Sequence, residues 1–143
     1  MKIIGYAEKY RDDMIFMVLE AKDALGRIPT INPDLLDISA CYLSKGEPFW
    51  LAMDENDRVI GCVGYHAIPG SNGVRLQRLY VKAKRKRQGI GTALLLTAER
   101  AAKRDGKSEI VVHMGGKEYI ESRYFYPKHG YSEYQPDWMK KEL

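Results

Sequence analysis

Residues 76–98, LQRLYVKAKRKRQGIGTALLLTA, constrain the fold of this chain more than any other segment. An apolar run at 76–81 is typical of a strand, and a basic linker separates it from Gly89 and Gly91, which open an apolar-periodic helix. Because the first turn of a helix leaves backbone N–H groups unpaired and carries the positive end of the helix dipole, it favours a phosphate. Five of the six residues 82–87 are basic, so the approach is cationic. We therefore expect a strand–loop–helix unit that binds a phosphorylated ligand.

The size and composition of the chain place this unit in one soluble domain. With 143 residues, of which 45% are hydrophobic and 29% charged, we expect a single globular domain over residues 1–143. A large part of the formal net charge of +4 lies in residues 82–87, whereas nucleic-acid binders are usually more basic along a whole face. We therefore do not expect nucleic acid as the main partner.

The two cysteines and the absence of long apolar runs indicate the cellular setting. No stretch approaches the ~18 apolar residues of a membrane-spanning helix, and the first residues do not form a signal peptide. Cys41 and Cys62 lie far apart and have no metal-ligand spacing, which favours free thiols in a reducing compartment. We expect a cytoplasmic protein with no membrane span and no bound metal.

Hydrophobic periodicity along the chain predicts a mixed α/β domain of the α+β type, with element order β-α-α-β-β-β-α-β-α-β-β. The strand at 74–81 has apolar residues in both registers, which is typical of a central strand covered on both faces. Strands are expected at 2–6, 49–53, 59–68, 74–81 and 109–114, with two short ones around Pro136. Helices are expected at 10–25, 33–43, 89–103 and 117–128.

Two common phosphate-binding loops do not fit the glycine segment. The nucleotide-binding P-loop needs GxxxxGK followed by Ser or Thr, and no such string occurs. The dinucleotide fingerprint GxGxxG needs a third glycine where this chain has Leu94. That fingerprint also follows its strand directly, whereas here residues 82–88 separate Val81 from Gly89. Both nucleotide interpretations are therefore disfavoured.

The same segment resembles a motif of the GNAT superfamily of N-acetyltransferases, in which a strand often ending Leu-Tyr-Val precedes [Arg/Gln]-x-x-Gly-x-[Gly/Ala]. Here residues 79–81 read LYV and residues 86–91 read KRQGIG, with Lys86 where the family usually has Arg or Gln. In that family the backbone N–H groups of the loop hold the pyrophosphate of acetyl-coenzyme A. The resemblance gives this role to Arg87, Gln88, Gly89, Ile90, Gly91 and Thr92.

A second segment strengthens the resemblance. Residues 124–131, YFYPKHGY, look like the later family motif Leu-Tyr-x-x-x-Gly-Phe, with Tyr126 at the Tyr position and Gly130 at the Gly position. The ending at 138–143 is similar to the family's final strand. The fold that this resemblance implies is a central, mostly antiparallel sheet with a splayed strand pair, flanked by helices.

Acetyl transfer from a thioester to an amine needs a donor to the carbonyl oxygen and an acid for the leaving thiolate. By resemblance, the donor is a backbone N–H on the strand that includes Leu79, Tyr80 and Val81, with Val81 the preferred choice. The acid is Tyr126, because a phenol with a pKa near 10 is protonated at neutral pH.

The general base stays open. Many relatives place a Glu where this chain has Arg75, which cannot accept a proton, and an Asn where it has Tyr119. Loss of the proton through ordered water is one alternative. The side-chain candidates are His66, His113, Glu118 and Glu121.

The resemblance implies an acetyl-coenzyme A-dependent N-acetyltransferase that moves acetyl directly to a primary amine, either a small molecule or a protein amine. Neither cysteine lies in a matched motif, so no acyl-enzyme is expected. The alternative is a non-catalytic module of the same fold that senses acetyl-coenzyme A, or that binds nucleic acid through residues 82–87. The acceptor is unknown, and a homodimer is left open.

Overall fold

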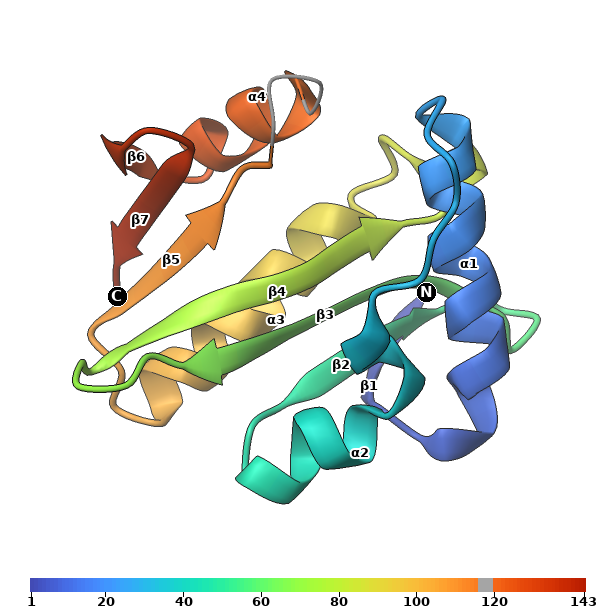
Figure 1. Ribbon diagram of the computed structural model, residues 1–143, viewed down its shortest axis with the longest axis horizontal. Helices are drawn as coiled ribbons and strands as arrows, with labels where there is room; N and C mark the ends of the chain where they lie inside the picture. Colours follow the sequence, from blue (N-terminus) through green and yellow to red (C-terminus); the bar gives the residue numbers. More distant parts are fainter. Residues whose placement is uncertain (116–119) are drawn as a thin grey trace.

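One seven-stranded sheet runs through the computed structural model, which describes residues 1–115 and 120–143 (Figure 1). The strand order is β1-β2-β3-β4-β5-β7-β6, and every neighbouring pair is antiparallel except β4 and β5. The strands are β1 (Lys2–Gly5), β2 (Phe49–Met53), β3 (Val59–Ala67), β4 (Gly73–Val81), β5 (Glu109–His113), β6 (Ser132–Gln135) and β7 (Trp138–Glu142).

Helices cover both faces of this sheet (Figure 1). The α-helices are α1 (Arg11–Ala24), α2 (Ile38–Cys41), α3 (Ile90–Arg104) and α4 (Ile120–Lys128), and short 3-10 turns lie at Glu8–Tyr10, Pro33–Leu36, Leu43–Lys45 and Ala83–Arg85. Met14 and Val18 of α1 pack with Leu51 on one face, whereas Leu94 and Ala98 of α3 pack on the other. The mixed α/β architecture predicted from periodicity is thus confirmed.

The single helix expected at 33–43 is wrong. The chain instead forms the 3-10 turn Pro33–Leu36, the one-turn helix α2 and the 3-10 turn Leu43–Lys45. Asp37 interrupts the helix because it adopts φ −146° and ψ 78°, and its carboxylate accepts a hydrogen bond from the Ala40 N–H at 3.0 Å. A short acidic side chain that caps the following turn competes with continuous helix in this way. The start expected for the helix at 117 lies outside the described residues.

A bulge in β4 and an early end to its pairing with β5 shape the functional end of the sheet. Cys62 pairs with Tyr80 and Gly64 with Gln77, so two residues of β4 oppose the single residue Val63. Arg78, inside this bulge, has φ 58°, a left-handed conformation that is uncommon for a non-glycine residue. Beyond it no described strand pairs with β4 on its other side, because β5 pairs only with residues 73–75. The predicted splayed strand pair is therefore confirmed.

Candidate functional site

A cavity of about 950 Å³ lies where the end of β4 meets the start of α3, α4 and the end of α1. Of the residues that the sequence predicted to contact coenzyme, all except Gln88 line this cavity, and Tyr126 lines it as well. A smaller cavity of about 340 Å³ lies beside Met1 and Asp57, where none of the predicted site residues is found. The larger cavity is therefore the candidate site.

The loop before α3 presents unpaired backbone donors to this cavity. Arg87 and Gly89 both adopt left-handed conformations, with φ 65° and 81°. Ala93 donates the first bond of the helix, to the Gly89 carbonyl at 3.0 Å, and no side chain caps the start. Across the described residues, no loop or cap bond is donated by the backbone N–H groups of 87–92. These donors, together with the helix dipole, suit a phosphate.

Acidic neighbours pair with two of the basic residues in the linker at 82–87. The Lys86 ammonium lies 2.9 Å from Glu121, and the Arg85 guanidinium lies 3.6 Å from Glu55 and 3.9 Å from Asp54. Arg87 is exposed, lines the cavity and makes no ion pair with any described residue. Two of the five basic residues of the linker are thus paired with carboxylates, and Arg87 places a cation at the cavity.

The backbone N–H of Val81 faces the side of β4 that β5 has left. The next residue, Lys82, donates its N–H to the Ile60 carbonyl of β3 at 2.9 Å, and Val81 is opposite Gly61. Bonded and non-bonded pairs alternate in an antiparallel ladder, so the Val81 N–H points away from β3. Val81 also lines the cavity. This N–H is therefore a donor available to a ligand in the splay.

Tyr126 lies at the inner wall of the cavity. Its ring packs edge-on against Phe125 at 5.2 Å and Tyr131 at 5.5 Å between centroids. Its hydroxyl makes no hydrogen bond within the described parts of the chain, and burial raises its pKa. The phenol is therefore protonated and ready to donate. His129, which the sequence reasoning did not select, also lines the cavity, with Nε2 3.2 Å from the Thr92 hydroxyl.

The candidate bases are scattered. Nδ1 of His66 lies 2.8 Å from Glu47 outside the cavity lining, and His113 packs against Trp138 at 4.8 Å. Glu121 alone of the described candidates lines the cavity, and it is exposed and paired with Lys86. Glu118 and Tyr119 lie outside the described residues.

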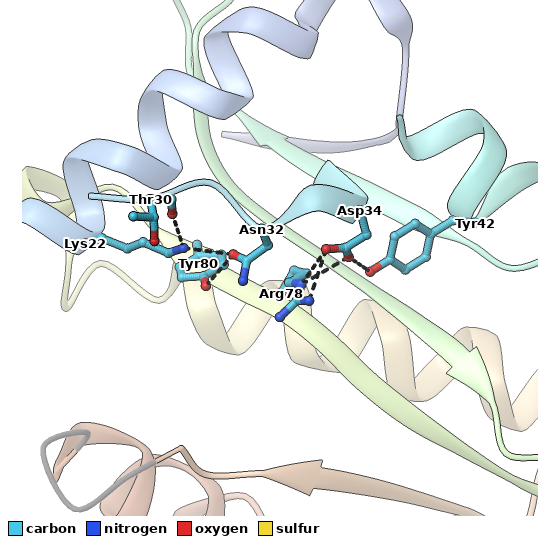
Figure 2. A network of polar contacts seen from close by, with 7 residues as sticks. All are labelled: Lys22, Thr30, Asn32, Asp34, Tyr42, Arg78 and Tyr80. Atoms are coloured by element: carbon cyan, nitrogen blue, oxygen red, sulfur yellow. Dashed lines mark hydrogen bonds and ion pairs between the residues drawn. The ribbon is translucent and has the colours of Figure 1, made fainter. Parts of the chain in front are cut away.

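An ion pair that the sequence did not indicate holds the β4 bulge (Figure 2). The Arg78 guanidinium donates to both carboxylate oxygens of Asp34, at 3.0 and 3.2 Å, and the Tyr42 hydroxyl donates to the same carboxylate at 2.6 Å. Burial pushes the pKa of Asp34 upward, but these hydrogen bonds outweigh it and hold the pKa below its usual value. The Arg78 carbonyl accepts the Cys62 thiol at 3.2 Å. The bulge is thus clamped from both its side chain and its backbone.

A second polar group fastens the loop after α1 to the end of β4 (Figure 2). The buried Lys22 ammonium donates to the Thr30 carbonyl and to Asn32 Oδ1, the latter at 2.9 Å. The Tyr80 hydroxyl donates to the same Asn32 oxygen at 3.2 Å. Tyr80 lines the cavity, so this network holds in place the part of the cavity wall that lies next to α1.

A splayed parallel pair in a mostly antiparallel sheet, with an uncapped helix start beside it, defines the acyl-coenzyme A N-acyltransferase class. A model of the acetyltransferase (GNAT) family matches residues 14–131. The chain belongs to this family.

The chain is also similar in sequence to curated N-acetyltransferases. Human N-acetyltransferase 8 is 37% identical over 91 residues, which cover 60% of this chain and 40% of the relative. The probable N-acetyltransferase 14 of Xenopus tropicalis is 33% identical over 82 residues, which cover 57% of this chain and 40% of the relative. The match thus spans about 40% of the length of these relatives.

Solved structures agree on the fold. A GNAT-family acetyltransferase from Staphylococcus aureus Mu50 superposes with a TM-score of 0.89 at 23% identity, covering 99% of this chain and 98% of that one. The PaiA N-acetyltransferase from Thermoplasma acidophilum, solved in complex with coenzyme A, superposes with a TM-score of 0.79 at 20% identity and covers 100% of both chains.

Two features are absent from the described residues. None of the helices there combines the length and apolar character needed to cross a membrane. No group of three or more metal-ligating side chains is found in the same part of the chain.

Proposed function

We propose that this protein transfers acetyl from acetyl-coenzyme A directly to a primary amine. The observation that carries the proposal is one continuous cavity that joins the unpaired donors at the start of α3, the Val81 N–H and the Tyr126 hydroxyl. Coenzyme phosphates bind at the start of α3, where Gly89 and Gly91 keep the backbone accessible. The thioester then lies in the splay of β4 and β5.

Two groups of this chain act on the reacting atoms. As the amine nitrogen forms its bond to the thioester carbon, the Val81 N–H stabilises the negative charge that develops on the carbonyl oxygen. The carbon–sulfur bond breaks, and Tyr126 donates its proton to the leaving sulfur. The proton released by the acetylated nitrogen leaves through water, since Glu121 is exposed and already paired with Lys86. The proton taken from Tyr126 is replaced by the same route.

Direct transfer is favoured over an acyl-enzyme because the thiols are badly placed. Burial raises the pKa of the Cys62 thiol to about 12, and its Sγ is bonded to the Arg78 carbonyl. Neither Cys62 nor Cys41 lines the cavity. A nucleophilic cysteine needs the thiolate form and access to substrate. Both cysteines are free. Because free thiols are typical of reducing compartments, we also propose a cytoplasmic location.

The competing proposal is a binding module without catalysis. Nucleic-acid binding through residues 82–87 is disfavoured by the pairing of Arg85 and Lys86 with acidic side chains. Calorimetry with acetyl-coenzyme A and with duplex DNA separates the two classes. We expect micromolar coenzyme binding and no salt-sensitive DNA binding. A panel of amines and peptides, assayed for release of coenzyme A, tests catalysis; binding without release on any amine would favour the sensor.

A further inference from the structure

The face of β4, β5 and β7 opposite α3 carries an exposed arginine on an aromatic ring. Val74, Ile110 and Met139 point into the core beneath α3, so their neighbours along each strand point to the other face. In Figure 1, α3 lies behind β4, and no described helix is drawn in front of β5 and β7. Arg75 and Trp138 therefore lie on an open face of the sheet.

Arg75 leans toward the splay. In register it lies opposite Val111 of β5, whereas Trp138 of β7 lies opposite His113, two residues nearer the end of β5. The guanidinium carbon nevertheless lies 4.9 Å from the centroid of the Trp138 ring, and His113 packs against the same ring. A cation over an indole face is held in place by the ring quadrupole. The Arg75 side chain is thus directed toward the place where β4 and β5 separate.

The charge of Arg75 is not compensated by its surroundings. Lys140 on the same face lies 3.8 Å from Glu109, and Arg78 is bound to Asp34. Glu47, near Arg75 through its partner His66, is bonded by His66 and by the Ala67 N–H. Over residues 1–115 and 120–143, no carboxylate lies within ion-pair distance of Arg75. Among the described residues, the donors of Arg75 on this face are therefore free for a ligand.

We propose that Arg75, positioned by Trp138, binds a carboxylate that the acceptor carries beside its amine. This inference rests on the proposed acetyl transfer. A guanidinium presents a planar fork of donors that matches a carboxylate with two parallel hydrogen bonds. The face beside the splay would then admit the acceptor from the side opposite α3. Amino acids, and peptides with an acidic residue near their terminal amine, are acceptors of this chemistry. Polycationic amines are repelled.

The test compares matched acceptors. ω-Amino acids of increasing length are assayed beside n-alkylamines of equal length, and peptides beginning Ala-Glu beside those beginning Ala-Gln, by coenzyme A release. We expect kcat/KM to favour the carboxylate member of at least one arm by about tenfold to a hundredfold, the range of a charged hydrogen-bond pair. The first arm identifies a small acceptor and the second a peptide. R75Q should abolish the preference, R75E should reverse it in favour of diamines, and neither should change acetyl-coenzyme A affinity.

K140Q is the matched control, because Lys140 lies on the same face, over the ring of Tyr134, but has an acidic partner. It should keep the preference. Equal acetylation of both members of every pair, or a preference that survives R75Q, would overturn the inference and leave the proposed function standing. If coenzyme binds but no amine is acetylated, the proposed function fails and this inference fails with it. Thermal melting of each variant shows that it is folded.

Discussion

The Arg78 guanidinium and the Asp34 carboxylate, 44 residues apart in sequence, lie 3.0 Å from each other beside the β4 bulge. Arg78 supplies both this side chain and the left-handed backbone that makes the bulge. The bulge changes the register of β4 just before Val81. The ion pair therefore couples the loop after α1 to the donor that we assign to the thioester carbonyl.

Replacing Asp34 by Asn should disturb this coupling. The neutral amide keeps the size of the side chain but loses the charge that binds Arg78, so we expect the free energy of unfolding to fall by about 1–3 kcal/mol. We also expect kcat to fall while acetyl-coenzyme A affinity is kept, because the start of α3 is untouched. Urea denaturation and steady-state kinetics measure the two effects. D12N removes an exposed pair with Arg11 and should cost under about 1 kcal/mol; an equal loss in both variants would contradict the clamp.

Gly89 should be indispensable for coenzyme binding. An added Cβ would meet nothing within 4 Å, so the strain of a side chain at φ 81° is the only structural cost of G89A, about 1 kcal/mol. In G89E the bulk and negative charge enter the space assigned to the pyrophosphate, and we expect the coenzyme Kd to rise about 100-fold or more. Calorimetry measures this change.

Gly70 offers a control for the strain, because it has φ 74° and open space but lies in the turn before β4, at the opposite end of that strand from Val81. G70A should lose similar stability and keep full coenzyme affinity. Normal affinity in G89E would refute the assignment of this loop.

Tyr126→Phe should separate catalysis from binding. Loss of the hydroxyl removes the proton donor to sulfur but leaves the ring contacts with Phe125 and Tyr131. We expect kcat to fall about 100-fold, the lower range for a general acid, with coenzyme affinity unchanged. Tyr124 lines the same cavity but is 75% exposed, so Y124F is the matched control and should be nearly silent. An unchanged rate in Y126F across several amines would exclude Tyr126 as the acid.

The sequence predicts those parts of the site that depend on short, continuous segments of the chain. The glycine pair, the apolar periodicity of α3 and the spacing to Tyr126 are local patterns, and the structure brings these segments to one cavity. The Asp34–Arg78 pair and the stacking of Arg75 on Trp138 depend on strand register and on a loop crossing the sheet. No local pattern encodes such contacts.

His66, one of the four candidate bases, lies outside the cavity lining because of the direction of its strand. It is the second-last residue of β3 and comes just before the Pro69–Gly70 turn. Since β3 is antiparallel to β4, His66 lies beside Arg75, where the pairing of β4 with β5 ends, and its Nδ1 is taken up by Glu47 at 2.8 Å. The helix at 33–43 failed for a different reason, because Asp37 caps a new turn instead of continuing the old one. Strand direction explains the position of His66, and the cap at Asp37 explains the interrupted helix.

Buried tyrosines should make the fold sensitive to alkaline pH. Burial raises the pKa values of Tyr42, Tyr126 and Tyr131 above 10, and carboxylate partners raise those of Tyr42 and Tyr131 further. The unfolded chain therefore loses phenolic protons at a lower pH than the folded one. Stability is complete below pH 10 and falls as pH rises above it, by up to about 1.4 kcal/mol per pH unit for each such tyrosine.

Urea denaturation between pH 8 and 11 measures this dependence. We expect the free energy of unfolding to be level up to about pH 9 with respect to these groups and to decline steeply above 10. Y131F also loses the hydrogen bond to Glu99, so its free energy of unfolding at neutral pH should be lower. Above pH 10, its free energy of unfolding should fall less steeply with pH, by the slope that corresponds to about one proton. Y126F should be shallower by the same amount. A slope equal to that of the unsubstituted protein in both variants would mean that these phenols ionise alike in the folded and unfolded chains.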